Sequence, residues 1–191
     1  MYKLFLKRLI DLVLSFVAII ILIIPMLIIS LVILLTDPGP VFFKQKRFGK
    51  NKKYFRIIKF RTMKVNTPDV PTDKLDNPEQ YVTSIGKFLR KTSLDELPQL
   101  FNIFLGQMSF IGPRPALWNQ KSLIRLRDKV HANDIRPGLS GWAQINGRDD
   151  IPEKKKAELD GEYVEKMSFW FDCKCFFGTF LKVFRSEGVK S

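Results

Sequence analysis

The sequence predicts a mostly helical α/β protein in which a membrane-embedded helix precedes one small domain. Its 191 residues correspond to one domain of roughly 150 residues plus a short appendage. Hydrophobic residues make up 46% of the chain and charged residues 27%, which favours a packed core over disorder. The apolar residues are concentrated near the N-terminus, and the rest of the chain alternates between strand-like and helix-like patterns. We therefore place a membrane segment at residues 1–36 and a cytosolic domain at residues 37–191.

The membrane segment is an apolar run from Leu12 to Leu35, interrupted only by Ser15, Pro25 and Ser30. As a straight helix at ~1.5 Å per residue, its length is ~36 Å, which is enough to cross a ~30 Å hydrocarbon core. The run is too long for the apolar part of a signal peptide, so we expect it to be retained.

The flanks of this run are basic on both sides, and basic flanks prefer the cytoplasm. A helix that crosses the bilayer places one basic flank on the unfavoured side. Pro25 removes a backbone hydrogen bond near the middle of the run. A re-entrant helix–break–helix, with its break near Pro25, returns both flanks to the same face. An ordinary transmembrane helix with a tolerated proline is the alternative, and the residues alone leave both open.

The segment after the membrane helix is strongly basic. Asp37-Pro38-Gly39-Pro40 ends the helix, and residues 44–64 then contain ten basic residues and no acidic one. Alternating apolar residues in this stretch predict a strand or hairpin with one basic face. A polybasic patch on acidic lipid is an equally simple interpretation. Residues 65–80, with three prolines, are expected to form a mobile loop.

Two helical pieces are expected in residues 85–104, namely Ile85–Lys91 and Ser93–Phe104. Ser93 and Glu96 match a capping box. Pro98 disfavours that interpretation, because proline fits the first turn of a helix better than its interior. In that case Asp95 and Glu96 lie at or just before a helix N-terminus.

The C-terminal half predicts two charged helices, at residues 117–133 and 151–166, around a glycine-rich loop at residues 134–148. Before them, Met108–Pro115 forms a rigid turn that presents Arg114 between two prolines. Residues 169–184 contain seven phenylalanines and tryptophans. This density suits a helix that lies in the membrane interface, and a helix packed in the core explains it equally well.

The net charge and the content of histidine and cysteine limit the range of possible functions. A net charge of +13 favours anionic partners such as nucleic acid, phosphorylated metabolites or acidic membranes. The single histidine excludes a multi-histidine metal site, and the Cys173-x-Cys175 spacing fits neither a zinc site nor a disulfide framework. The chain contains no P-loop and no dinucleotide-binding glycine motif.

The chemistry is expected at the adjacent carboxylates Asp95 and Glu96. The simplest interpretation of two adjacent carboxylates is a solvated or helix-capping pair. The arginines expected around them favour a catalytic interpretation instead. An ionised Asp is able to act as a nucleophile, a Glu is able to help hold Mg²⁺, and arginines bind phosphate. These are the parts of a phosphoryl-transfer site. The candidate substrate-binding residues are Arg90, Arg114, Arg136 and Arg148.

Five ordered motifs together resemble the small monotopic phosphoglycosyl transferases, the bacterial sugar transferase family. The motifs are DPGPVFFKQKRFG (Asp37–Gly49), KFRTM (Lys59–Met63), SLDELPQLFN (Ser93–Asn102), MSFIGPRP (Met108–Pro115) and RPGLSGWAQINGR (Arg136–Arg148). The resemblance implies transfer of a sugar-1-phosphate from a UDP-sugar to polyprenol (undecaprenyl) phosphate, with UMP as the other product. It also implies a location on the cytoplasmic face of the bacterial inner membrane. The sugar and the pathway, such as capsule or exopolysaccharide, are left open.

The resemblance also assigns roles to residues. Asp95 attacks the β-phosphate and carries a covalent phospho-sugar, and Glu96, with Asp95, holds Mg²⁺. Arg114 binds donor phosphate and Arg148 the nucleotide end, while Lys59 and Asp172 match further active-site positions. The family's membrane helix re-enters at a proline, which favours a break at Pro25 here. Many relatives have Ser before this proline, whereas this chain has Ile24.

Two non-catalytic functions compete with this interpretation. A membrane-anchored basic domain is able to bind nucleic acid through phosphates, but a carboxylate pair among the arginines repels a phosphate backbone, so no nucleic-acid partner is expected. A scaffold that recruits other glycan-assembly enzymes is the second alternative. A homo-oligomer and contacts with downstream glycosyltransferases are compatible with either function.

Overall fold

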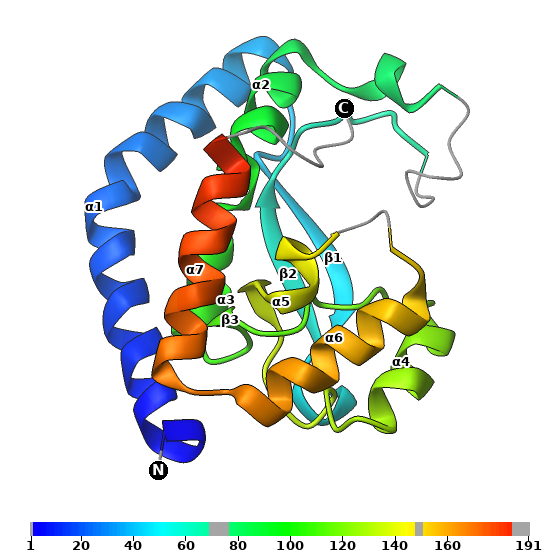
Figure 1. Cartoon of the computed structure of the whole chain (residues 1–191). Coiled ribbons are helices and arrows are strands. Elements are labelled where there is room, and N and C mark those ends of the chain that lie inside the picture. Colours follow the sequence, from blue (N-terminus) through cyan, green and yellow to red (C-terminus); the bar gives the residue numbers. More distant parts are fainter. Residues whose placement is uncertain (1, 69–76, 148–150, 185–191) are drawn as a thin grey trace.

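The computed structural model describes residues 2–68, 77–147 and 151–184. A short π-helical turn at Tyr2–Leu6 leads into the long helix α1, and a β-hairpin follows (Figure 1). The remaining elements are short helices, two three-residue strands and two longer C-terminal helices. The helices are α1 (Lys7–Thr36), α2 (Ser84–Thr92), α3 (Gln99–Phe104), α4 (Lys121–Asp128), α5 (Trp142–Ile145), α6 (Glu153–Lys166) and α7 (Phe169–Phe184). The strands are β1 (Phe42–Phe48), β2 (Tyr54–Phe60), β3 (Ser109–Ile111) and β4 (Gly138–Ser140).

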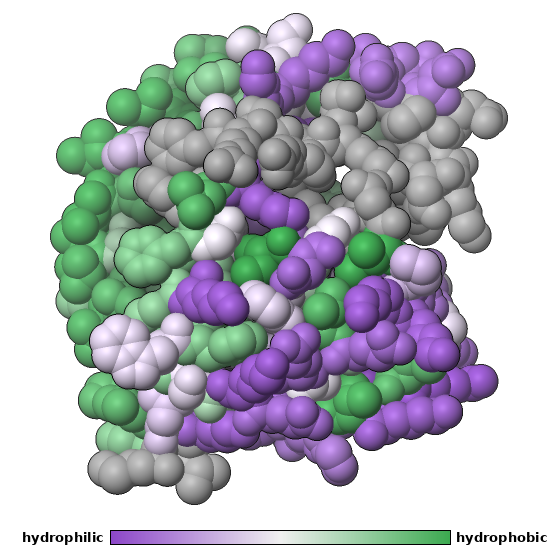
Figure 2. All heavy atoms as spheres, viewed as in Figure 1, coloured by the Kyte–Doolittle hydropathy of each residue, from purple (hydrophilic) through white to green (hydrophobic). Residues whose placement is uncertain are grey.

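Helix α1 is long and apolar enough to cross a membrane by its length and composition. It continues through Pro25 without an interruption, and Figure 1 shows it as one curved ribbon along one side of the molecule. The missing N–H of a proline bends a helix without ending it when neighbouring turns keep their hydrogen bonds. One face of α1 is buried against the domain, at Asp11, Ser15, Met26 and Ile33. The other face is apolar and exposed, as the hydrophobic edge in Figure 2 shows.

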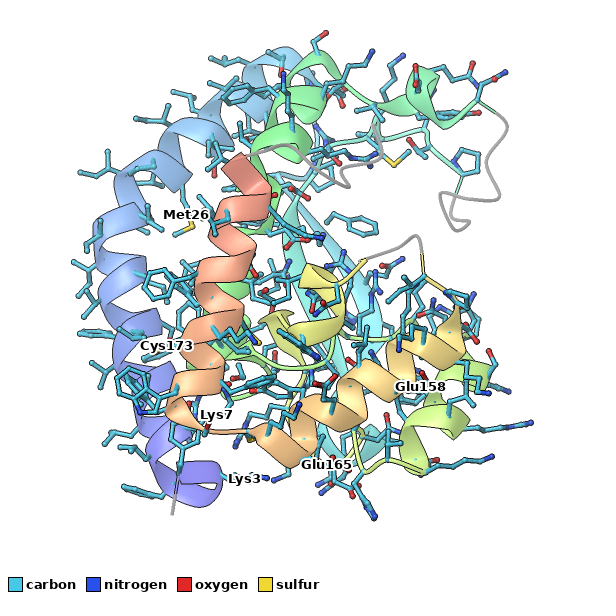
Figure 3. All side chains as sticks on the ribbon, viewed as in Figure 1. Lys3, Lys7, Met26, Glu158, Glu165 and Cys173 are labelled. Carbon is cyan, nitrogen blue, oxygen red and sulfur yellow. The ribbon has the colours of Figure 1, made fainter. Side chains whose placement is uncertain are left out.

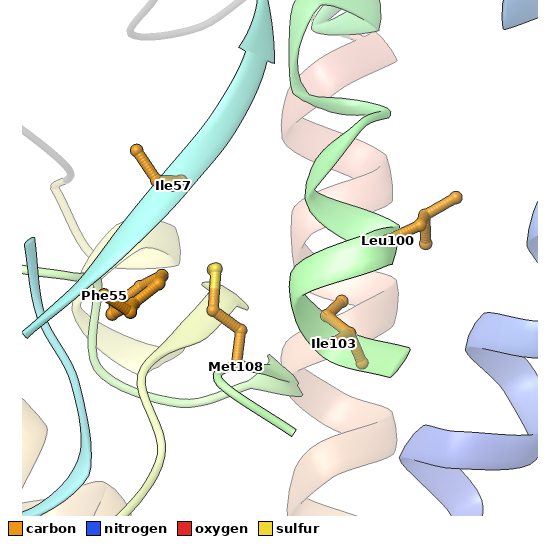
Figure 4. Packing of buried hydrophobic residues seen from close by; sticks show 5 residues of the cluster. All are labelled: Phe55, Ile57, Leu100, Ile103 and Met108. Carbon is orange, nitrogen blue, oxygen red and sulfur yellow. The ribbon is translucent and has the colours of Figure 1, made fainter. Parts of the chain in front are cut away.

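The hairpin confirms the strand pattern read from the basic segment. Strands β1 and β2 pair antiparallel, with Phe42 opposite Phe60 and Phe48 opposite Tyr54. The two faces of β2 pack against different partners. Phe55 and Ile57 join a buried cluster with α3 and Met108 (Figure 4). Phe60 instead packs with Met26 and Ile33 of α1 and with α2, so β2 connects the membrane helix to the domain core.

The expected loop at residues 134–148 is partly ordered. Strand β4 pairs parallel with β3, and the short helix α5 follows it. The helix expected at residues 117–133 is shorter at both ends, because α4 runs only from Lys121 to Asp128. After α4, His131 adopts φ 57°, and the Asn133 amide donates to the Ile124 carbonyl at 2.8 Å and to Asp128 at 2.8 Å. These bonds close the helix end earlier than its charge pattern indicates.

The last two helices form where the sequence predicts them. Helix α6 packs against α4 and α5, and hydrophilic side chains gather over this part of the molecule (Figure 2). Helix α7 has both of the faces that the two interpretations require. Cys175 is fully buried, whereas the exposed fractions of Trp170 and Phe177 are 79% and 63%. Residues 69–76 of the expected loop lie outside the described part of the chain.

Candidate active site

The carboxylate pair lies in a 3₁₀ turn, Leu94–Glu96, between α2 and α3. Ser93 ends α2 with a left-handed backbone (φ 57°), and its side chain makes no capping hydrogen bond. The capping-box interpretation is therefore wrong. Pro98 immediately precedes the first residue of α3, so the expectation that the pair lies just before a helix N-terminus is confirmed. The chain reversal at Ser93 turns both carboxylates toward the end of β2.

Lys59 is the residue that joins this turn to the hairpin. Its Nζ donates to Glu96 Oε1 at 2.6 Å and lies 3.6 Å from Asp95 Oδ2. Arg114 reaches the same oxygen, with its Nη2 3.7 Å from Glu96 Oε1. Four of the residues singled out in the sequence thus meet at one place, although they come from three distant segments of the chain.

The electrostatics of Asp95 reflect two opposing effects. Only 8% of the residue is exposed, and this burial raises the pKa of its carboxyl above the ordinary value, with Glu96 adding to the rise. The positive charges of Lys59, Arg90 and Arg114 oppose it. The sequence-based argument considered only the stabilising charges. Burial makes the ionised carboxylate less stable than in water, and a desolvated anion is a stronger nucleophile.

Arg90 belongs to the surroundings of this pair. It extends from the last turn of α2, and its Nε donates to Thr62 Oγ1 at 3.0 Å. Its charge acts on Asp95 without a direct hydrogen bond. The KFRTM segment, which comprises the last two residues of β2 and the three that follow, therefore fixes Arg90 beside the carboxylate through Thr62 and also supplies Lys59.

Asn102 positions the lysine, and the sequence reasoning gave it no role. It is fully buried, and its side chain binds the main chain of β2 on both sides of Ile57. The Oδ1 atom accepts from the Ile58 N–H at 3.0 Å, and Nδ2 donates to the Arg56 carbonyl at 2.9 Å. Nδ2 also donates to Gln107 Oε1 at 2.7 Å. These bonds set the distance between the strand carrying Lys59 and the helix that follows the carboxylates.

A second buried network holds the Arg114 turn. Arg127 Nη1 donates to the Arg114 carbonyl at 2.9 Å. The same guanidinium pairs with Asp160 at 2.7 Å, and both partners are buried. Burial raises the pKa of Asp160, and the positive charge of Arg127 opposes the rise. Arg127 in α4 and Asp160 in α6 thereby fix the backbone position of Arg114.

Three predicted site residues are not part of this group of contacts. Asp172, in the first turn of α7, accepts from Lys7 Nζ at 2.6 Å and from Tyr163 at 2.7 Å, and it also bonds the Tyr2 hydroxyl. Arg136 donates from Nε to the Gly106 carbonyl at 2.8 Å. Arg148 lies outside the described residues. The role of each in substrate binding stays a prediction.

The pair also has the donor set for a magnesium ion. In the part of the chain that the structure describes, no group of three or more His, Cys, Asp or Glu residues gathers around a common point. Mg²⁺ usually takes only one or two protein carboxylates, and substrate phosphates and water complete its six ligands. Asp95 and Glu96 supply such a set of oxygen donors, so the residues present fit this ion.

These features define a membrane-associated protein with a cation-lined carboxylate site suited to phosphate groups. Comparison with known proteins identifies the family within this class. A sequence profile of the bacterial sugar transferase family matches residues 2–186, and the chain belongs to this family.

Three relatives illustrate the range of the family. The chain is 42% identical to the UDP-glucose:undecaprenyl-phosphate glucose-1-phosphate transferase of Escherichia coli (strain K12), over 96% of this chain and 41% of the relative. It is 42% identical to the uncharacterized sugar transferase EpsL of Bacillus subtilis (strain 168), over 80% of this chain and 74% of the relative. It is 35% identical to the undecaprenyl-phosphate galactose phosphotransferase of Salmonella typhimurium, over 97% of this chain and 42% of the relative. The chain thus spans about two fifths of the length of the first and third relatives.

Proposed function

We propose that this protein is a phosphoglycosyl transferase that moves a sugar-1-phosphate from a UDP-sugar to polyprenol phosphate, with undecaprenyl phosphate as the lipid. The observation that carries the proposal is the pair of buried Asp95 and half-buried Glu96, contacted by Lys59 and Arg114 in a domain packed along an apolar helix. The site suits a soluble phosphorylated donor, and the helix brings it to a membrane acceptor. The names of the relatives, which specify UDP-glucose and undecaprenyl phosphate, support both substrates.

The transfer proceeds in two steps on Asp95. In the first, a carboxylate oxygen of Asp95 forms a bond to the β-phosphorus of the UDP-sugar, the bond from that phosphorus to the bridging oxygen breaks, and UMP leaves. In the second, a phosphate oxygen of the polyprenol phosphate attacks the same phosphorus and releases the Asp95 carboxylate. The product is a polyprenyl-diphosphate sugar. Arg114 and Lys59 bind and neutralise the phosphate oxygens around this phosphorus.

Magnesium is part of the proposal, with Glu96 and Asp95 as its protein ligands. When bound, the ion neutralises negative charge on the donor diphosphate. In the structure, Glu96 is bound by Lys59 at 2.6 Å. We propose that this lysine holds the Glu96 carboxylate in place before substrate arrives and afterwards contacts a substrate phosphate.

We further propose that α1 enters and leaves the membrane on the cytoplasmic face, so that the protein is monotopic. The buried face of α1 packs on the domain from Asp11 to Ile33, which covers most of its length. If α1 crossed the bilayer upright, the short helices α2 and α3 that pack along it, and the charged domain behind them, would be drawn into the hydrocarbon core, at high cost in free energy. The curvature of α1, the proline inside it and the basic flanks at both ends suit a shallow re-entrant path. The residue before the proline is Ile24, so no side-chain hydroxyl at that position is available to hydrogen-bond the backbone groups that Pro25 leaves without a partner.

A single substitution tests the reaction. The purified chain in detergent is incubated with Mg²⁺, undecaprenyl phosphate and either UDP-glucose, UDP-galactose or UDP-N-acetylgalactosamine, and UMP release is measured. We expect UMP release that depends on the lipid and on one of the sugars. Asp95→Asn should abolish both turnover and the phospho-sugar adduct seen by mass spectrometry, whereas Asp134→Asn, at an exposed position, should leave them unchanged. Wild-type turnover by Asp95→Asn would refute the assignment, and a folded protein inactive with every donor would favour a scaffold.

Topology is tested with single cysteines. After Cys173 and Cys175 are replaced by serine, Tyr2→Cys and Asn51→Cys are made separately, and a membrane-impermeant thiol reagent is added to intact cells and to inverted vesicles. Both positions should react only in the inverted vesicles, because the re-entrant path leaves both ends of α1 in the cytoplasm. Labelling of position 2 in intact cells would establish a transmembrane helix and contradict the proposal.

A further inference from the structure

A small basic cleft of about 50 Å³ opens beside the start of α1. We call it the N-terminal cleft. Its charged lining consists of Lys3, Lys7, Arg8, Lys50, Arg136 and Asp11. Figure 3 shows Lys3 in the π-helical turn and Lys7 at the beginning of α1, with Glu165, at the end of α6, near Lys3. Five basic side chains and one acidic one therefore face a common space.

The positive charge of the cleft is only partly neutralised by carboxylates. Lys7 pairs with Asp172 at 2.6 Å, and Asp11 Oδ1 accepts a backbone hydrogen bond from Phe110. Arg8 and Arg136 lie close enough to repel each other electrostatically. Such repulsion is relieved when an anion binds between the cations. The cleft therefore favours a negatively charged group.

Main-chain carbonyls hold these cations in place. Lys3 Nζ donates to two carbonyls at the end of α6, at 2.6 and 3.1 Å. Arg8 donates to two carbonyls at the end of α3, at 2.7 and 2.8 Å. Arg136 Nε donates to the Gly106 carbonyl at 2.8 Å. Carbonyls orient the ammonium and guanidinium groups without cancelling their charge, so the cleft is preorganised for an anion.

Gly106 makes room for this arrangement. Its backbone has φ 77°, in the left-handed region, and a Cβ atom there would lie 3.2 Å from Arg8 Nη2. A side chain at this position would be strained and would crowd the guanidinium. A glycine here leaves space for two arginines at the end of one short helix.

The N-terminal cleft is distinct from the Asp95 site. Lys50 lies in the turn of the hairpin, whereas Lys59 lies near the other end of β2. A strand of this length, at ~3.3 Å per residue, separates the two positions by roughly 20 Å. A phosphate in the cleft is therefore too far from Asp95 to take part in the transfer.

The neighbouring surface indicates the source of the phosphate. The apolar side chains of Phe104 and Leu105, beside the carbonyls that bind Arg8 and Arg136, are 37% and 65% exposed. Phe104 stacks on Phe16, which belongs to the exposed apolar face of α1, and this continuous apolar surface is suited to acyl chains. Inorganic phosphate would use the cations and leave this apolar surface uncovered, whereas a lipid would use both.

We propose that the N-terminal cleft binds the phosphate of an anionic membrane phospholipid, whose acyl chains lie over Phe104, Leu105 and the exposed apolar face of α1 at Phe16. This site is separate from the Asp95 site, and in it Arg136 is assigned to the lipid phosphate in place of the substrate-binding role that the sequence predicts for it. Its binding requires no turnover, so failure of the proposed transferase activity would leave the test below unaffected.

The test titrates dihexanoyl-phosphatidylglycerol into the full chain in non-ionic detergent, and binding is measured by calorimetry. We expect saturable binding to one site, with weaker binding of neutral dihexanoyl-phosphatidylcholine. Lys3→Gln/Lys50→Gln should weaken phosphatidylglycerol binding on the order of 25-fold, since each basic residue near a lipid surface contributes about fivefold. Lys53→Gln/Lys129→Gln removes the same charge outside the cleft lining and should change affinity by no more than about twofold.

Three results would overturn the proposal. The first is the absence of saturable lipid binding. The second is an equal loss of affinity in both double variants, which would indicate attraction by net charge alone. The third is displacement of the lipid by inorganic phosphate at similar concentrations, which would make the cleft a site for free phosphate. Because Lys3 also bonds the end of α6, Lys50→Gln alone is measured too, and its expected loss is about fivefold.

Discussion

Asn102→Ala tests whether the buried amide connects strand β2, which carries Lys59, to the segment that follows the Leu94–Glu96 turn. The substitution removes three hydrogen bonds, of 3.0, 2.9 and 2.7 Å, from a fully buried side chain. Each such bond contributes about 1 kcal/mol, and a buried group left without a partner costs about 1–3 kcal/mol. Gln107 is able to turn toward solvent, but the Ile58 N–H and the Arg56 carbonyl are main-chain atoms of β2. We therefore expect a loss of about 3 kcal/mol in the free energy of unfolding.

The assay is thermal unfolding of the detergent-solubilised chain, followed by circular dichroism. For a chain of this size, 1 kcal/mol changes the Tm by about 2–4 °C, so the Tm should fall by about 6–12 °C. Asn146→Ala is the matched control, because Asn146 is exposed and makes one side-chain hydrogen bond, to the Trp142 carbonyl. Its Tm should stay within about 2 °C of the wild type. UMP release by Asn102→Ala, measured well below its Tm, should also fall, because Lys59 follows the strand segment that the amide holds.

Two results would refute this reasoning. If Asn102→Ala melted like Asn146→Ala, the three bonds would not stabilise the fold. If the Tm fell as expected while UMP release stayed at the wild-type rate, the amide would be a structural group with no effect on the position of Lys59.

Two further predictions concern the buried charges. Since burial raises the pKa of Asp95 in the folded chain, the native state binds more protons than the unfolded state between the ordinary and the raised values, and stability falls as the pH rises through the folded pKa. Asp95→Asn should therefore melt at a higher temperature than the wild type at pH 7.5, with the gain vanishing below the ordinary pKa of 3.8; a lower Tm at pH 7.5 would contradict it. Arg127→Met leaves Asp160 buried without its cation and should cost about 3–5 kcal/mol, whereas Arg127→Met/Asp160→Leu should recover much of this loss. Denaturant unfolding of the two variants measures the difference, and equal stabilities would show that the charge on Asp160 is tolerated alone.

The sequence predicts the longer elements of this fold because their signals are local. Periodicity and end residues are sufficient for the hairpin, for α6 and for α7. The β3–β4 pair is different, since each strand has three residues and its partner lies far along the chain. No window of sequence around residues 134–148 contains the information that Gly138 pairs with Ser109. Without that information, the glycines and the short apolar stretch in this segment predict a loop.

The same distinction applies to the site. Adjacent carboxylates followed by a proline are a local pattern, and they predict that Asp95 lies just before the N-terminus of a helix. Asn102 acts through main-chain atoms of β2, which become its neighbours only after folding. One signal was available: an amide within the apolar stretch Leu-Phe-Asn-Ile-Phe needs hydrogen-bond partners once that stretch is buried. Arg127 and Asp160 carried no comparable signal, because both lie in helices rich in charge.

Packing also couples the position of the Asp95 site relative to a membrane with the position of α1. Phe60, next to Lys59, is buried against Met26 and Ile33 of α1. At the other end of the helix, Arg8 is bound to the end of α3, the helix that follows the carboxylates. Because α1 is held at both ends by elements that also hold the site, the helix cannot move deeper or shallower without moving Asp95. In the proposed reaction the acceptor phosphate lies at the membrane interface, so a rigid connection of this kind would set the approach of lipid to carboxylate without requiring a mobile domain.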